Sequence, residues 1–354
     1  MSHQDQDLTD VLADEVRRAH DLGTPLALVG GETKSFLGRS VTGRRLPLGE
    51  HRGILRYEPT ELVLTARAGT PLDQIHGLLA AQGQWLPFEP PSFGASATLG
   101  GTIACGLSGP ARPFTGAARD FVLGVRLLNG KGEILRFGGE VIKNVAGYDV
   151  SRFVTGAQGT LGVLLEISLK VSPRPPASET LAWEEAPETA VRRLCRLAAE
   201  PFPISAACHD GERLFVRLCG SKAGVQAAAQ RIGGDRMVDP ELFWESVRER
   251  THSFFARPGP LWRLSVPPAT LPPAPGRGSL FLDWSGAQRW WRGALEPAAV
   301  WEWARSRGGH ATLLDAGRSC LQPLEPALLS LHRRLKASFD PKRILNPGRL
   351  YDEV

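Results

Sequence analysis

The sequence predicts an α+β fold in two parts, followed by a short tail. In residues 1–175 strand and helix patterns alternate, and the run ends in the strand-like segment LGVLLEISLKV. A proline-rich linker, SPRPPAS at residues 172–178, comes next, and the composition changes beyond it. The last segment, FDPKRILNPGRL at residues 339–350, has the turn-rich character of a tail that docks elsewhere. We therefore divide the chain into residues 1–175, 176–338 and 339–354.

The first part should open with an amphipathic helix over residues 7–22, because apolar side chains recur there at helical spacing. The strand PLALVG and the loop GGETKS follow, and GILRYEP and LVLTARA are short strand signals. Pro71 should open a second helix, which stops at Gly83. The segment FVLGVRLLNGKGEILRF predicts a β-hairpin that turns at Asn129 and Gly130.

The second part mixes helices and strands. Helical patterns cover residues 187–199, 221–232, 296–306 and 323–338, and strands such as RLFVRLCG and SLFLDW alternate with them. The proline-rich stretch at residues 267–279 predicts a surface loop or an internal boundary. We find no internal repeat in the chain.

Composition excludes several classes of protein. The chain has 354 residues, is 42% hydrophobic and lacks the run of about 20 apolar residues that a spanning helix needs. Its N-terminus has no signal-peptide pattern, so we expect a cytoplasmic protein that reaches the inner face of a membrane only through partners. The net charge is +5, and no basic run interleaved with aromatic residues predicts nucleic-acid binding.

The cysteines and histidines predict no metal site. The five cysteines are dispersed, whereas an iron–sulfur cluster needs clustered thiolates. The eight histidines are also far apart in the sequence. An iron–sulfur cluster would therefore have to be held by another chain.

Glycine-rich segments carry the functional signal. The loop at residues 29–35 directly follows a strand, and its N–H groups can form a nest for a diphosphate, with Thr33 and Ser35 adding hydroxyl donors. Residues 98–102, followed by Gly106 and Gly109, allow a second close approach of backbone to a flat ligand. Taken singly, each cluster is more often an ordinary turn. Their combination and order point to FAD.

Two other nucleotide-binding motifs are absent from the sequence. No GxGxxG follows a strand, and no GxxxxGK[ST] occurs anywhere in the chain. Dinucleotide binding of the Rossmann type and P-loop phosphate binding are therefore not expected.

Four ordered motifs resemble those of the vanillyl-alcohol-oxidase-type FAD proteins, also called the PCMH-type flavoprotein family. They are VGGETKSFLGR, ATLGGTIACGLSGP, KNVAGYDVSRFVTGAQGTLGVLLEISLKV and the terminal DPKRILNPG. The resemblance implies a two-subdomain FAD-binding domain over residues 1–175. It also implies an α+β cap domain with an antiparallel sheet over residues 176–338, and a tail, 339–354, that returns to the FAD domain.

The resemblance also implies which residues hold the cofactor. Those expected at the diphosphate are Gly30, Gly31, Thr33, Lys34 and Ser35. Those expected along the flavin and its ribityl chain are Thr98, Gly100, Gly101, Thr102 and Gly106. Those expected to close over the adenosine half are Gly156, Gly159, Gly162 and Val163. Asn346, in the tail, is expected near the flavin ring.

Two residues depart from the family pattern. Glu32 stands where the first loop often has a third glycine, and its carboxylate should point away from the diphosphate or accept loop N–H groups. Gln158 stands where a glutamate is common. Because the first loop has no histidine, we expect the FAD to be non-covalent.

Catalytic residues are harder to predict. Oxidation of a 2-hydroxy acid needs a base and a clamp for the carboxylate. The His-rich HGDGNxH-like cap motif of related autonomous dehydrogenases does not occur here. His310 is the best candidate base, and Arg217 and Arg263 are candidate clamps, although each of these residue types is more often structural. Cys105 could lie near the flavin but is more often a small apolar filler.

Within this family the motifs are most similar to those of the FAD-binding subunits of bacterial glycolate oxidases. The resemblance implies a role in oxidising glycolate to glyoxylate, with electrons passing through flavin to a second FAD-linked oxidase subunit and an iron–sulfur subunit. One alternative is a self-sufficient FAD-dependent 2-hydroxy-acid dehydrogenase, of the D-lactate type, that uses His310 and a cap arginine. Another is a flavin-free structural subunit, which only Glu32 and Gln158 favour.

Overall fold

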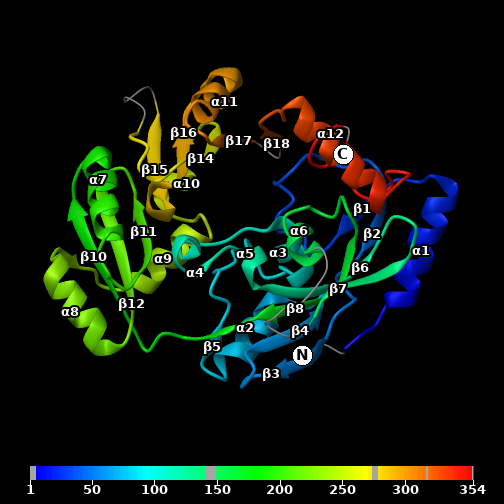
Figure 1. Cartoon of the computed structure of the whole chain (residues 1–354), viewed down its shortest axis with the longest axis horizontal. Helices are drawn as coiled ribbons and strands as arrows, with labels where there is room; N and C mark the ends of the chain where they lie inside the picture. Colours follow the sequence, from blue (N-terminus) through cyan, green and yellow to red (C-terminus); the bar gives the residue numbers. More distant parts are fainter. Residues whose placement is uncertain (1–4, 140–148, 273–277, 316–317, 353) are drawn as a thin grey trace.

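The computed structural model describes residues 5–139, 149–272, 278–315, 318–352 and 354. A five-stranded antiparallel sheet, with the strand order β3-β4-β8-β6-β7, forms the centre of the first part of the chain (Figure 1). Its strands are β3 (Ile54–Glu58), β4 (Val63–Arg67), β6 (Val122–Leu128), β7 (Ile134–Gly138) and β8 (Val163–Lys170). β8 occupies the middle of this sheet and is buried along most of its length, which explains its nearly continuous apolar sequence.

Helices α2 (Leu72–Ala80) and α3 (Leu99–Cys105) supply the apolar core of this sheet. Leu72, Ile75 and Leu79 recur at helical spacing on α2 and are fully buried. The short helices α4 (Arg112–Thr115), α5 (Ala118–Phe121) and α6 (Val150–Phe153) lie along the connections. β5 (Gln84–Trp85) pairs with β9 (Ser172–Pro173), so the predicted linker at 172–178 begins in a short antiparallel pair.

A smaller unit at the N-terminus combines α1 (Thr9–Leu22) with β1 (Leu26–Val29) and β2 (Arg44–Pro47), which are parallel to each other. Leu12 and Val16 of α1 pack on Leu26 of β1. Ile344 and Leu345, from the end of the chain, complete the same core cluster. β1 is therefore buried partly by a segment that lies more than 300 residues later in the sequence.

A nine-stranded antiparallel sheet forms the second part, in the order β13-β10-β12-β11-β15-β16-β14-β17-β18. Four of its strands are β10 (Ala177–Glu184), β11 (Ile204–His209), β12 (Arg213–Gly220) and β13 (Asp235–Arg236). The other five are β14 (Leu261–Ser265), β15 (Ser279–Asp283), β16 (Gln288–Arg292), β17 (His310–Asp315) and β18 (Arg318–Leu321). A short 3-10 turn, η1 (Trp284–Gly286), joins β15 to β16.

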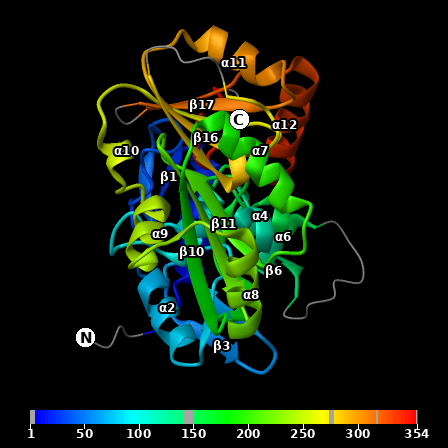
Figure 2. The ribbon, with the colours of Figure 1, turned by 90° about the vertical axis from the view of Figure 1, so that its left-hand side faces the viewer.

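Helices cover both faces of this sheet. α7 (Pro187–Ala198) and α8 (Lys222–Ile232) pack on a cluster that contains Leu214 and Val216 of β12. α9 (Pro240–Arg248) and α10 (Ser253–Ala256) pack on a cluster that contains Phe215, between those two residues. Alternate residues of a strand point to opposite faces, so the two helix pairs lie on opposite sides. Figure 2 shows α8 and α9 on either side of β10. α11 (Pro297–Arg305) covers β14 and β16.

The chain ends against the first part. α12 (Pro326–Phe339) spans the predicted boundary at residue 338, and Lys336, on its last turn, is fully buried. Its ammonium group donates to the carbonyl oxygens of Thr160 and Leu345, at 2.7 and 2.6 Å. Leu345 then forms a parallel bridge with Leu26. The division at 1–175, 176–338 and 339–354 remains a proposal, which these contacts support for the tail.

Most of the predicted elements are present. The hairpin at residues 122–138 and helices near residues 7–22, 71–83, 187–199, 221–232, 296–306 and 323–338 are confirmed. The sequence interpretation did not identify α3 or α9. No helix in the described ranges combines the length and the apolar character that crossing a membrane requires.

Candidate functional site

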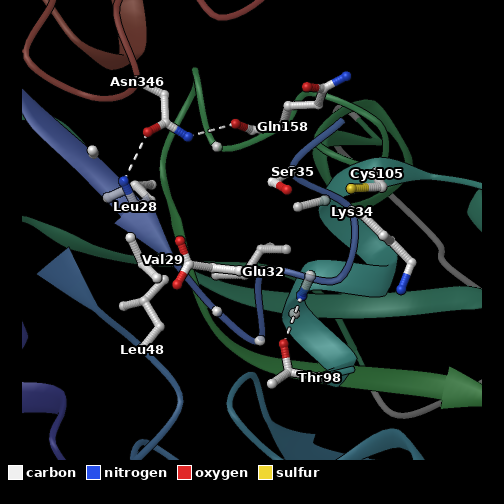
Figure 3. A pocket seen from close by; sticks show the side chains of 18 of the residues that line it. Leu28, Val29, Glu32, Lys34, Ser35, Leu48, Thr98, Cys105, Gln158 and Asn346 are labelled. Carbon is white, nitrogen blue, oxygen red and sulfur yellow. Dashed lines mark hydrogen bonds between the residues drawn. The ribbon is translucent and has the colours of Figure 1, made fainter. Parts of the chain in front are cut away.

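A cavity of about 260 Å³ lies at the carboxyl end of β1, close to the lower end of the ~300–1,000 Å³ range of small-molecule sites (Figure 3). The loop at residues 30–35, the start of α3, the segment at 158–162 and the tail meet around it. The predicted cofactor residues that line it are Gly30, Gly31, Glu32, Thr33, Lys34, Ser35, Thr98, Gly100, Gly101, Gly159, Gly162 and Asn346. Segments from four distant parts of the sequence thus form one site.

The loop at residues 30–35 offers unused hydrogen-bond donors. Within the described ranges, the backbone N–H groups of residues 31–34 donate to no other residue, whereas Ser35 N–H donates to the carbonyl oxygen of Glu32. Consecutive free N–H groups in a turn form an anion-binding nest. The loop therefore retains the donors that a diphosphate needs.

Close packing behind the cavity explains two of its glycines. A Cβ atom on Gly31 would lie 1.6 Å from the carbonyl oxygen of Ser96, and one on Gly100 would lie 2.7 Å from the Cβ atom of Ala68. Neither position has room for a side chain. The sequence interpretation assigned these glycines to close approach by the ligand, whereas here the contact that excludes a side chain is with the protein itself.

Asn346 joins three segments at one edge of the cavity. Its side-chain oxygen accepts the N–H of Leu28 at 2.8 Å, and its amide nitrogen donates to the carbonyl oxygen of Gln158 at 2.7 Å. Figure 3 shows both hydrogen bonds. The tail therefore holds the end of β1 and the segment after α6 together.

Glu32 is paired with a residue that the sequence interpretation did not identify. Arg45 of β2 donates two hydrogen bonds to its carboxylate, at 3.1 and 2.8 Å, and also lines the cavity. These hydrogen bonds hold the pKa of Glu32 below its ordinary value. Glu32 has a φ of 56°, a region that favours glycine, so the usual glycine would fit this backbone as well. The carboxylate therefore pairs with Arg45, and its expected orientation away from the diphosphate remains a prediction.

Lys34 is the buried cation of the cavity. Its ammonium group donates to the carbonyl oxygen of Ser92 at 3.1 Å, and its side chain is largely buried. Burial lowers its pKa, and Cys105 and Glu249 partly offset that effect. Cys105, itself in the cavity lining, has a pKa raised by burial, as expected for an inert thiol.

The remaining predicted cofactor residues lie outside the cavity lining. Val163 is the first residue of β8 and is fully buried in the core beneath it. Thr102 is buried on α3. Gly106 and Gly156 face each other, since a Cβ atom on Gly106 would lie 2.9 Å from the Cα atom of Gly156. Part of the KNVAGYDVSRF motif, residues 143–148, lies outside the described residues.

The predicted catalytic residues do not lie in this cavity. His310 is exposed at the start of β17. Arg217 forms an ion pair with Glu89 at 2.8 Å and lies over the ring of Trp244 at 5.1 Å. These contacts are typical of a structural residue, and its role as a clamp remains a prediction. In the described part of the chain, no group of three or more His, Cys, Asp or Glu side chains is arranged to hold a metal ion.

Arg263 lines a second, much smaller cavity, of about 20 Å³, which is enough for one water molecule. Residues 107–110 of the first part and strands β14 and β16 of the second enclose it. Arg263 donates to the side-chain oxygen of Gln288 at 2.6 Å, and Arg250 lies over the ring of Trp290. Burial raises the pKa of Asp283, which lines the same cavity, to about 6.

Comparison with known proteins agrees with this geometry. Residues 8–138 match the FAD binding domain family, and residues 321–350 match the C-terminal domain of FAD linked oxidases. Glycolate oxidase subunit GlcE of Escherichia coli (strain K12) is 46% identical over 98% of this chain and 99% of its own length. The chain belongs to the family of this glycolate oxidase subunit.

Other proteins are similar to this chain at lower identity. Glycolate oxidase subunit GlcD of Bacillus subtilis (strain 168) is 32% identical over 51% of this chain and 38% of its own length. Two crystal forms of an alkyldihydroxyacetonephosphate synthase share the fold, with TM-scores of 0.65 and 0.66 and 15% and 14% identity. The matched regions cover 96% of this chain and about three quarters of those chains, 74% and 75%.

The cofactor of this family fits the cavity. Free N–H groups in the loop at 31–34 suit a diphosphate, and Gly100 and Gly101 line the cavity without side chains. The chain is therefore an FAD-binding protein of the FAD-linked oxidase class. The positions of individual residues against the cofactor remain proposals.

Proposed function

We propose that this chain is the FAD-binding subunit of a glycolate oxidase complex that oxidises glycolate to glyoxylate. The observation that carries the proposal is the cavity with its free N–H donors, in a chain that is 46% identical to a glycolate oxidase subunit over almost the whole of both proteins. FAD supplies the acceptor for the hydride. The residues of this chain bind and orient the cofactor.

The partners in this proposal are a second FAD-linked oxidase subunit and an iron–sulfur subunit. The relative named GlcD, which is also a glycolate oxidase subunit, matches about half of this chain and supports the presence of a second, related subunit. Electrons would pass from the flavin of this chain to those partners. We still expect the protein to be cytoplasmic and to reach the inner face of the membrane through its partner subunits.

The test is the visible spectrum of the purified chain before and after anaerobic addition of glycolate. We expect a flavin spectrum that stays oxidised in the isolated chain and bleaches when the partner subunits are present. Deleting the chain should abolish glycolate-dependent dye reduction in cells, and unchanged reduction would overturn the proposal. Acid precipitation should leave the yellow colour in the supernatant, because we expect the FAD to be non-covalent.

A self-sufficient 2-hydroxy-acid dehydrogenase is the second candidate, and one observation favours it. Arg250, Arg263 and Asp283 meet at the contact between the two parts, and they are groups of the kind that clamp a substrate carboxylate and accept a proton. A 2-hydroxy acid would have to widen the cavity of about 20 Å³ that they line. The exposed position of His310 does not support its predicted role as the base. Bleaching of the isolated chain by glycolate or D-lactate would favour this candidate, and His310→Ala should then leave the turnover unchanged.

The flavin-free alternative has lost its two supporting observations. Glu32 is neutralised by Arg45, and Gln158 contributes its carbonyl oxygen to Asn346 and its side-chain oxygen to Arg349. Neither residue blocks the free N–H groups of the loop. A folded chain that takes up no FAD, alone or with its partners, would nevertheless revive this alternative.

A further inference from the structure

We propose that Arg45 binds the diphosphate of FAD directly, and that Glu32 holds its guanidinium group over the cavity until the cofactor arrives. The inference rests on the proposed FAD-binding function and adds a cationic ligand that no motif identifies. Arg45 lies on β2, outside the glycine-rich loops, and reaches the cavity because β2 runs parallel to β1.

The position of Arg45 follows from the strand pairing. Ala27 lies opposite Arg45, and Val29 lies opposite Pro47, so β2 runs alongside the strand that leads into the loop at 30–35. Leu46 points into the core, which directs its neighbour Arg45 outward to the cavity side. Arg45 and Glu32 both line the cavity.

Arg45 can leave its ion pair with Glu32 and bind a phosphate instead. The side chains of Arg45 and Glu32 are 64% and 54% exposed. Ion pairs that water reaches contribute little to stability, so separating this pair costs the fold little. A guanidinium group matches the paired oxygens of a phosphate as well as those of a carboxylate, and the diphosphate offers more negative charge.

The other two cations in the lining are already engaged by neutral groups. Lys34 donates to the carbonyl oxygen of Ser92, and Arg349 donates to the carbonyl oxygen of Arg39 and the side chain of Gln158. Arg45 is instead held by an anion that stands in the diphosphate-binding loop. The carboxylate of Glu32 therefore offers Arg45 the same kind of hydrogen-bond acceptor as a phosphate oxygen would.

A simpler reading gives Arg45 an indirect role, in which it only neutralises Glu32 and so prevents repulsion of the diphosphate. The two interpretations predict different FAD affinities for a double variant that lacks both charges. If Arg45 is only a neutraliser, removing both charges should restore the affinity for FAD. If Arg45 contacts the diphosphate, the double variant should stay weak.

The experiment is a double-mutant cycle on the whole chain, with the dissociation constant of FAD measured by the quenching of flavin fluorescence. Arg45→Ala should weaken binding by about ten- to a hundredfold, the range expected for charge-assisted hydrogen bonds. Glu32→Gln should tighten binding severalfold, because Arg45 loses its competing partner. The double variant, Glu32→Gln with Arg45→Ala, should remain at least about tenfold weaker than Glu32→Gln alone.

Arg44→Ala is the matched control, since Arg44 is adjacent on β2 and pairs with Glu15 of α1. It should change the affinity by less than about twofold. Thermal melting of each variant shows that it is folded. A double variant that binds FAD as tightly as Glu32→Gln alone would overturn the role of Arg45 and leave the proposed function intact. A wild-type chain that binds no FAD would contradict both.

Discussion

The side-chain amide of Asn346 donates a hydrogen bond of 2.7 Å to the carbonyl oxygen of Gln158, 188 residues earlier in the chain. Its oxygen at the same time accepts the N–H of Leu28. One nearly buried side chain therefore links the tail, β1 and the segment after α6 at the edge of the FAD cavity. Because the tail supplies these contacts, the shape of the cavity depends on the last residues of the chain.

Asn346→Ala should lower the free energy of unfolding by about 2–4 kcal/mol, because two buried backbone groups lose their partners. The backbone adds to the loss, since Asn346 has a φ of 42°, which asparagine tolerates better than alanine. Asn346→Asp keeps an acceptor for Leu28 but places an oxygen against the carbonyl of Gln158. Urea unfolding measures both variants. A change below about 0.5 kcal/mol in Asn346→Ala would show that water replaces the amide at no cost.

Gly31→Ala should disturb the loop that offers the free N–H groups. The new methyl group would lie 1.6 Å from the carbonyl oxygen of Ser96, so the backbone must move. Overpacking of this kind costs about 1–3 kcal/mol, and we expect the affinity for FAD to fall as well. Gly77→Ala on α2 is the control, because nothing lies within 4 Å of its Cβ position. That variant should stabilise the chain by about 0.5–1 kcal/mol. Equal effects of the two variants in thermal melting would contradict the packing argument.

Glu249 links the nine-stranded-sheet part to the FAD cavity. Its carboxylate accepts the N–H groups of Ser92 and Phe93, at 3.0 and 2.8 Å, and the carbonyl oxygen of Ser92 accepts the ammonium group of Lys34. Glu249→Ala should therefore loosen residues 91–94 and weaken FAD binding severalfold.

Hydrogen exchange of the peptide that contains residues 91–96 measures this loosening, which should appear as faster exchange. Glu245→Ala is the control, because Glu245 lies one turn earlier on α9, is exposed and, among the described residues, forms its ion pair with Arg248. Exchange that is unchanged in Glu249→Ala would show that the loop holds its shape without the carboxylate.

Lys336 and Asp340 form a fully buried ion pair, at 3.0 Å, beneath the tail. Lys336→Met removes the donor to the carbonyl oxygens of Thr160 and Leu345 and leaves the charge of Asp340 without its cation. We expect a loss of about 3–5 kcal/mol, the range for breaking one side of a buried pair.

Lys342→Met is the matched control for that variant. Lys342 also donates to a backbone carbonyl oxygen, that of His20, but on the surface. Its replacement should cost less than about 1 kcal/mol. Denaturant unfolding that shows equal losses for Lys336→Met and Lys342→Met would mean that Asp340 is satisfied by the N–H groups of Ile344 and Leu345 alone.

Local patterns made part of this structure predictable. The apolar periodicity of α1 and the turn residues of the β6–β7 hairpin depend only on residues close in the sequence, so both elements could be predicted. The helix α3 was read as a loop because Gly100 and Gly101 lie inside it. Thr98, whose side chain accepts the N–H of Gly101, was the available signal of a helix start.

Long-range contacts made the rest unpredictable from one sequence. Arg45 meets Glu32 only because β1 and β2 pair, and no motif marks that pair. Arg217, predicted as a clamp, is held by Glu89 from the other part of the chain. Val163, predicted in the cofactor loop, is drawn into the core by the start of β8. In each case the partner of a side chain depends on tertiary packing, which the order of residues does not display.

His51 should make the stability of the FAD-binding part sensitive to pH. Its ring is fully buried, with one nitrogen accepting the N–H of Leu8 at 3.0 Å and the other donating to the carbonyl oxygen of Leu165 at 3.1 Å. This arrangement requires the neutral ring, with its proton on Nε2. Burial lowers the pKa of His51 below its ordinary 6.5, and Arg67 adds to the effect, while Asp7 and Glu166 oppose it.

Because the folded pKa lies below the unfolded one, the unfolded chain binds the proton more readily in acid. The contribution of His51 is therefore complete above about pH 6.5 and is lost as the pH falls toward the folded pKa. The difference in stability between wild type and His51→Gln should shrink between pH 7.5 and pH 5, as urea unfolding at several pH values measures. Two parallel curves would show that His51 keeps the same protonation in both states, and the neutral assignment would then be wrong.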